Sequence, residues 1–161
     1  MTRVLVVNGP NLDLLGTREP AIYGPTTLAE LDGLIRERAA ELGLAVECFQ
    51  SNHEGILIDR LHRRDFDVAI VNAAGLTHTS VSLRDCLLAI ERPFVEVHLS
   101  DPATREPFRQ VNFLHDIAAR SIVGQGPRGY LLALEAIAAG LSGPGERPDD
   151  AGHPSSGSGH G

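Results

Sequence analysis

The sequence predicts a doubly wound α/β domain built on a five-stranded parallel sheet. Five short runs of aliphatic and β-branched residues alternate with longer segments in which apolar residues recur at helical spacing. The short runs are nearly continuous in apolar character, as strands are when helices cover both faces of a sheet. Strict alternation of strand and helix favours a parallel sheet between two helical layers. Five strands favour the flavodoxin-like order 2-1-3-4-5.

The expected strands occupy residues 3–7, 44–49, 67–72, 93–98 and 120–123. The expected helices occupy residues 27–42, 54–63, 80–91, 107–117 and 128–141. The first helix is the most clearly marked, because Thr27 and Glu30 have the spacing of a capping box and Gly43 suits the helix end. Its apolar face consists of Leu28, Leu31, Ile35, Ala39 and Leu42. For the third helix we expect Thr79 or Ser80 to serve as the N-cap.

The length of 161 residues suits one domain with a sizeable core. We expect a single catalytic domain over residues 1–141. Residues 142–161 contain six Gly, four Ser and three Pro and almost no apolar side chain, so we expect a disordered tail.

Composition excludes several classes of protein. A formal charge of −7 argues against nucleic-acid binding, which needs a basic surface. The sequence shows neither a membrane span nor a signal peptide, and Cys48 and Cys86 stand alone as expected for reduced thiols, so we expect a cytoplasmic protein. All 14 basic residues are Arg. The absence of Lys excludes Schiff-base chemistry and a phosphate-loop Lys.

Polar side chains gather after the strands, where parallel α/β sheets bind ligands. Arg105 and Arg109, one helical turn apart, could reach the same edge. Each residue alone suits a turn or a cap, but four strand ends that carry amides or imidazoles predict one shared site. The segments are Asn8–Asn11, Gln50–Glu54, Asn72–Ser80 and Glu96–Ser100, with Gly124–Gly126 after the last strand. Zinc motifs and a nucleophile elbow are absent, which leaves acid-base chemistry on an anion.

Residues 8–24, NGPNLDLLGTREPAIYG, connect the first strand to the first helix. Such a connection ordinarily needs about two to six residues. We expect this one to fold over the site as a lid carrying Arg18 and Tyr23. A guanidinium beside a tyrosine favours its anionic form, which can act as a base next to a carbonyl. The alternative is that Tyr23 only packs within the loop.

Six segments together resemble type II 3-dehydroquinate dehydratase, in order from residue 3 to about residue 140. They are NGPNLDLLGTREPAIYG (8–24), QSNHEG (50–55), NAAGLTHTSVSLRD (72–85), EVHLS (96–100), REPFR (105–109) and GQGPRGYLLAL (124–134). The resemblance implies a flavodoxin-like fold and removal of water from 3-dehydroquinate to give 3-dehydroshikimate, in the shikimate route to aromatic amino acids. It implies neither a metal, nor another cofactor, nor a Schiff base.

The resemblance also implies roles for individual residues. Tyr23 as tyrosinate removes the C2 proton, Arg18 holds it, and Asn11 holds a water that stabilises the enolate. His98 protonates the leaving hydroxyl while Glu96 orients its imidazole. The remaining implied contacts are those of Asn72, His78 and Arg109 with ring hydroxyls, of the Leu99 and Ser100 amides with the carboxylate, and of Asp85 with a neighbouring subunit's site. The implied assembly is a dodecamer built from trimers.

Four positions depart from the family's usual pattern. Asp101 stands where Asn is usual, Ala74 where Gly is usual, and Asn112 and His115 where Ser is more frequent. Two alternatives to this enzyme are a non-catalytic α/β module that binds a small cyclic hydroxy-acid and another lyase or isomerase acting on a related acid. The first would tolerate loss of Tyr23, Arg18 or His98, and the second would have different hydroxyl ligands.

Overall fold

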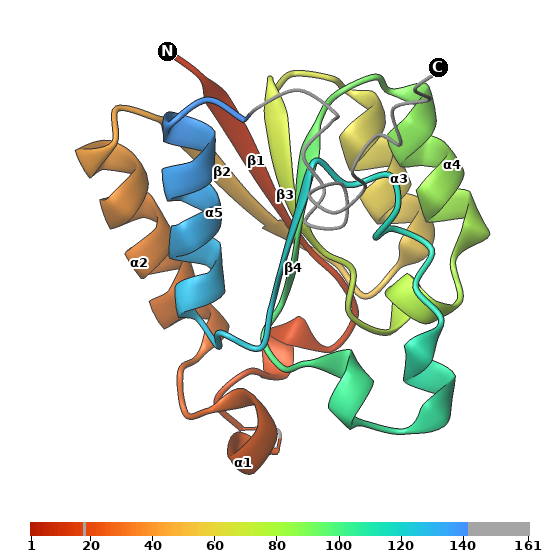
Figure 1. Cartoon of the computed structure of the whole chain (residues 1–161). Coiled ribbons are helices and arrows are strands. Elements are labelled where there is room, and N and C mark those ends of the chain that lie inside the picture. The colour runs from red at the N-terminus through yellow and green to blue at the C-terminus, as the bar shows by residue number, and fades with distance from the viewer. Residues whose placement is uncertain (18, 142–161) are drawn as a thin grey trace, which may run out of the picture.

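A computed structural model describes residues 1–17 and 19–141 and shows one sheet between two layers of helices (Figure 1). The sheet consists of β1 (Arg3–Asn8), β2 (Ala45–Gln50), β3 (Val68–Asn72), β4 (Phe94–His98) and β5 (Arg120–Val123). All pairs of strands are parallel, and their order is β2-β1-β3-β4-β5. The predicted flavodoxin-like sheet is therefore confirmed. The predicted tail at 142–161 and Arg18 lie outside the described residues.

The helices cover both faces of the sheet. Helices α2 (Leu28–Glu41) and α5 (Arg128–Ala138) lie on one face, and α3 (Glu54–His62) and α4 (Val81–Ala89) lie on the other (Figure 1). Successive residues of β1 show why its sequence is apolar throughout. Val4 and Val6 pack under α2 and α5, whereas Leu5 and Val7 pack under α3 and α4.

Side-chain caps fix the starts of two helices. Thr27 Oγ1 accepts from the Glu30 amide at 3.2 Å, which confirms Thr27 as the N-cap of α2, and it donates to the Glu30 carboxylate at 3.1 Å. Gly43 follows α2 with a φ of 71°, the left-handed conformation that glycine adopts without strain. Ser80 Oγ accepts from the Leu83 amide at 2.8 Å, so Ser80 is the N-cap of α4.

The predicted helix over 107–117 is wrong. Only a short 3₁₀ turn, η4 (Pro107–Gln110), forms there, after a similar turn η3 (Pro102–Thr104). Asn112 Oδ1 accepts from the Leu114 and His115 amides at 2.8 and 3.0 Å. The Phe113 amide donates to the Thr77 carbonyl at 3.0 Å. These bonds use groups that a continuing helix would need, and they tie the segment to η2 (Ala74–His78) instead.

The long first loop is folded locally and contains η1 (Leu12–Leu14) and α1 (Pro20–Tyr23). It starts close to β3, because the Gly9 amide donates to the Asn72 carbonyl at 2.8 Å. A Cβ at Gly9 would lie 2.5 Å from the Ala73 carbonyl oxygen, so only glycine fits this approach. No helix in the described part of the chain is both long and apolar enough to cross a bilayer.

Candidate active site

The register of the sheet sets polar side chains beside one another at its carboxyl edge. Asn8, the last residue of β1, pairs with Gln50 of β2 on one side and with Asn72 of β3 on the other. Beyond this edge lies a cavity that contains eight of the predicted site residues. Its lining residues are Pro10, Asn11, Leu12, Leu15, Tyr23, Asn72, Ala74, Gly75, His78, His98, Leu99, Ser100, Pro102, Arg105 and Arg109.

Tyr23 reaches the cavity from α1 and contacts Arg105, which lies between η3 and η4. Arg105 Nη1 donates to the Tyr23 phenol oxygen at 2.7 Å, and the guanidinium carbon lies 5.4 Å from the ring centroid. A donor that carries positive charge stabilises negative charge on that oxygen. The sequence indicated that Arg105 could reach this edge but assigned a role only to Arg109. The contact spans 82 positions, so spacing alone could not show it.

Glu96 lies beneath the cavity and is 1% exposed. Its Oε1 is 3.3 Å from His98 Nε2, although the N–H of the imidazole is not directed at that oxygen. Asn112 Nδ2 and Ser121 Oγ donate to the same oxygen at 3.2 and 3.3 Å. Burial raises the pKa of the Glu96 carboxyl, but His98 and Asn112 outweigh it, so the pKa lies below its usual value. Glu96 is therefore an anion at neutral pH.

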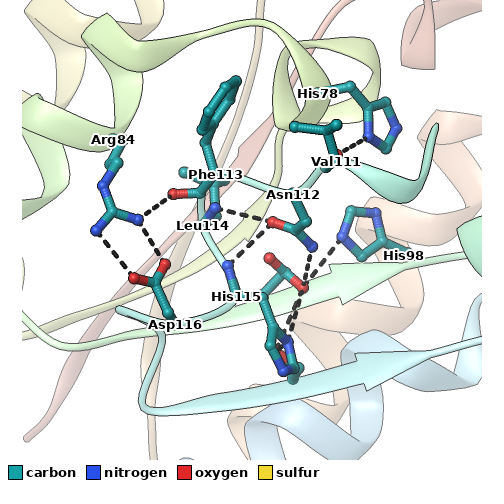
Figure 2. Close-up of polar contacts among 11 residues, drawn as sticks. His78, Arg84, His98, Val111, Asn112, Phe113, Leu114, His115 and Asp116 are labelled. Carbon is teal, nitrogen blue, oxygen red and sulfur yellow. Dashed lines mark hydrogen bonds and ion pairs between the residues drawn. The ribbon is translucent and has the colours of Figure 1, made fainter. Parts of the chain in front are cut away.

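Figure 2 shows how two of the unusual positions join this cluster. Asn112 both donates to Glu96 and shapes the turn that follows η4. His115 Nδ1 lies 3.0 Å from Ser121 Oγ and 3.8 Å from Glu96 Oε1. Both departures from the expected Ser thus contact the network that includes Glu96 and His98, and neither lines the cavity.

The other two departures are accommodated locally. Asp101 Oδ1 accepts from the Ala103 amide at 2.9 Å and caps η3, so this carboxylate is engaged by backbone. Ala74 has a φ of 53°, a conformation that costs an alanine about 1–2 kcal/mol. The turn after β3 therefore carries local strain at this position.

His78 and Arg109 also line the cavity. His78 Nδ1 lies 2.6 Å from the Val111 carbonyl oxygen (Figure 2). Because a carbonyl only accepts, Nδ1 carries the proton, and a neutral His78 then offers Nε2 as an acceptor. Arg109 Nε donates to Glu106 at 2.7 Å, and its guanidinium lies over the Phe108 ring.

Asn72 is fixed by a buried chain that the sequence analysis missed. Its Nδ2 donates to the Tyr130 phenol oxygen at 2.9 Å, and the Tyr130 hydroxyl donates to Asn8 Oδ1 at 2.6 Å. Asn72 Oδ1 accepts from the Ala74 amide at 3.2 Å. Tyr130 is fully buried, and burial raises the pKa of its phenol, so it stays neutral. The one available signal was the Tyr within the GQGPRGYLLAL segment.

The segments after β2 and β5 were expected at the site, but they do not line the cavity and instead bind the backbone of residues near it. Gln50 Nε2 donates to the Gly9 carbonyl at 3.2 Å, and the Asn11 amide donates to Asn52 Oδ1 at 2.9 Å. These contacts hold the start of the first loop. After β5, the Gly124 and Gly126 amides donate to the carbonyls of His98 and Leu99. Asp85 lies exposed on α4 and does not line the cavity.

Comparison with known proteins identifies the family. The family model described as dehydroquinase class II matches residues 2–138, which is most of the chain. The chain belongs to the class II dehydroquinases. The resemblance predicted from the sequence is confirmed.

Relatives and solved structures agree with this membership. A 3-dehydroquinate dehydratase of Xanthomonas campestris pv. campestris is 51% identical over 144 residues, covering 88% of this chain and 97% of that protein. A catabolic 3-dehydroquinase of Emericella nidulans is 50% identical over 137 residues, covering 84% and 90%. The crystal structure of type II dehydroquinase from Butyrivibrio crossotus matches with a TM-score of 0.82 at 37% identity, covering 84% of this chain and 97% of that one.

Proposed function

We propose that this class II dehydroquinase is a hydro-lyase that converts 3-dehydroquinate into 3-dehydroshikimate and water in the shikimate route. The observation that carries the proposal is that one cavity contains both a tyrosine held by a guanidinium and a histidine backed by a buried carboxylate. The first pair suits a base and the second an acid, and a β-elimination needs one of each. The family and the names of its relatives support the choice of substrate.

The first step is removal of the C2 proton by the Tyr23 phenolate, which leaves an enolate on the C3 carbonyl oxygen. Arg105 donates to the phenolate, and we propose that Arg18 acts with it, as the resemblance implies. Asn11 lines the cavity, and in our proposal its side chain holds a water that donates to the enolate oxygen.

The second step is collapse of the enolate with loss of the C1 hydroxyl. His98 gives a proton to that oxygen, so the departing group is water. Glu96 remains an anion throughout and stabilises the imidazolium before transfer. The proton removed from C2 stays on Tyr23 until solvent collects it, and His98 takes up another proton from water.

The remaining cavity residues suit recognition of a small hydroxy-acid. Asn72, held by Tyr130, and His78, held by Val111, offer fixed polar atoms for ring hydroxyls. Arg109 supplies a second cation, beside Arg105, to the same cavity. The backbone at Leu99 and Ser100, just beyond β4, is where we propose that the substrate carboxylate binds.

We further propose an oligomer, a dodecamer built from trimers, in which Asp85 serves a neighbouring subunit's site. Val81, Asp85 and Leu88 have the spacing of one outward face of α4. Val81 and Leu88 are 52% and 51% exposed, which suits a surface that a second copy covers. We also propose a cytoplasmic location, because Cys48 and Cys86 are both unpaired.

The direct test is incubation of pure protein with 3-dehydroquinate while the enone absorbance of the product is followed. We expect turnover that survives borohydride, because a chain without Lys has no side-chain amine for a Schiff base. Substrate binding without turnover would contradict the proposal and favour a sensor module.

A second experiment separates the two steps. His98→Asn removes the acid and retains the base, so C2 hydrogen should still exchange with deuterated solvent while water loss stops. Equal loss of exchange and elimination would show that His98 does not act as the acid.

A further inference from the structure

A second histidine contacts the network behind the proposed acid. His98 lines the substrate cavity and also a more open hollow, which His115 lines as well. The His115 side chain is 65% exposed, whereas the Glu96 side chain between them is 1% exposed. One buried carboxylate therefore faces one imidazole in the cavity and another in solvent.

The hydrogen bonds form a chain that runs from His115 through Ser121 to Glu96. Ser121 donates its hydroxyl to Glu96 Oε1 at 3.3 Å, so at 3.0 Å it accepts from the Nδ1–H of His115. Donors in such a chain polarise one another. When His115 gains a second proton, its charge lies 3.8 Å from the oxygen that also faces His98.

Other charges near His115 are already engaged. Arg84 pairs with Asp116 through two hydrogen bonds, Arg109 donates to Glu106, and Asp101 caps η3. Among the described residues, the charged side chains that line the hollow are Arg84, Asp101, Arg109 and Asp116, together with Glu96 and the two imidazoles. Glu96 is the carboxylate that both imidazoles share.

We propose that His115 is a positioning residue that acts on His98 through Ser121 and Glu96. Its Nδ1–H orients the Ser121 hydroxyl toward the carboxylate. Its protonated form places a second positive charge near the oxygen that also faces His98, so the charges of the two imidazoles oppose each other. The expected effect on turnover rests on the proposed function, in which His98 is the acid. The electrostatic effect of His115 on His98 does not depend on that assignment.

The test compares three variants by NMR titration of the His98 ring protons and by the pH dependence of turnover. His115→Asn retains a donor without a charge, His115→Ser removes the imidazole, and His115→Lys supplies a lasting cation. In Asn and Ser variants we expect His98 to retain its proton to a pH higher by about 0.3–1 unit, because a competing charge is gone. In the Lys variant we expect a shift of similar size to lower pH.

The basic limb of the turnover profile, where the acid loses its proton, should move in the same directions. The Asn variant should also retain more turnover than the Ser variant, since it preserves the donor to Ser121. A His98 titration that is identical in all three variants and the parent chain would overturn the proposal. Coupled titration in a chain that fails to turn over 3-dehydroquinate would instead overturn the proposed function alone.

Discussion

The chain has two tyrosines, and their surroundings are opposite in electrostatic character. Tyr23 sits on α1, a four-residue helix with no buried residue, and its oxygen meets the Arg105 guanidinium. Tyr130 is fully buried under the sheet, and its oxygen lies between the amides of Asn8 and Asn72. A cation stabilises a phenolate, whereas burial among neutral amides stabilises a phenol. The same side chain can therefore be a base in one place and a fixed hydrogen-bonding group in the other.

Tyr23→Phe tests the contrast between the two tyrosines most directly, and we expect it to have the largest effect. It removes the proposed base, so turnover should fall by at least about 100-fold. The melting temperature should hardly change, because the hydroxyl contributes little to the core. Steady-state kinetics and thermal unfolding together check both statements. Near-native turnover would reduce Tyr23 to a packing residue.

Arg105→Gln tests whether the cation makes Tyr23 different. Loss of a charged donor to the phenolate should lower turnover by about 10-fold to 100-fold. Because the anion is then less favoured, the rise of activity with pH should occur at higher pH. Arg105→Lys is the matched control, and it should recover part of the loss by restoring charge without the planar fork. A pH profile unchanged in both variants would remove Arg105 from the proposed mechanism.

Tyr130→Phe should act on stability and binding more than on chemistry. It leaves the buried Asn8 Oδ1 and Asn72 Nδ2 short of a partner, which should cost about 1–3 kcal/mol of unfolding free energy. We expect KM to rise a few-fold while kcat changes less, since Asn72 loses its anchor. Urea unfolding and steady-state kinetics provide the two readings. A collapse of kcat equal to that of Tyr23→Phe would erase the distinction between the tyrosines.

Ala74→Gly should have the smallest effect. Ala74 donates its amide to Asn72 Oδ1 from a left-handed conformation. Glycine relieves the strain but adds freedom to the unfolded chain, so the net gain should be below about 1 kcal/mol. Denaturant unfolding measures it, and unchanged KM would show that Asn72 is held mainly by Tyr130. A destabilised variant would mean that the alanine methyl contributes packing that outweighs its strain.

The sheet was predictable because its information is local. Each strand is a nearly continuous aliphatic run. Thr27 and Glu30 mark the start of α2 in the sequence, and Gly43 marks its end. The segment at 107–117 misled because its spacing of apolar residues suits a helix, while its backbone bonds go to Asn112 and Thr77. A helical period reveals neither the competing side chain of Asn112 within the segment nor the Thr77 carbonyl, which is distant in sequence.

The candidate site also has one part that could be predicted from the sequence and another that depends on contacts between distant residues. Asn72 and His98 end strands, and Asn11 and His78 come shortly after strands, so topology alone gathers them at one edge. Arg105 on Tyr23 and Tyr130 between Asn8 and Asn72 depend on contacts across 58 to 122 positions. Nothing in the spacing of those residues specifies such contacts. The roles assigned to these residues are predictions, and the variants above test those of Tyr23, His98, Arg105 and Tyr130.

The absence of buried residues in α1 has a consequence for how the cavity opens. A short helix anchored by Tyr23 and by polar contacts to Arg105 separates from the domain at a far smaller free-energy cost than any strand. We therefore expect its amides to exchange with deuterium orders of magnitude faster than those of β1, whose Leu5, Val6 and Val7 are almost fully buried. Product can then leave by local detachment of α1 while the sheet that places His98 and Asn72 stays intact.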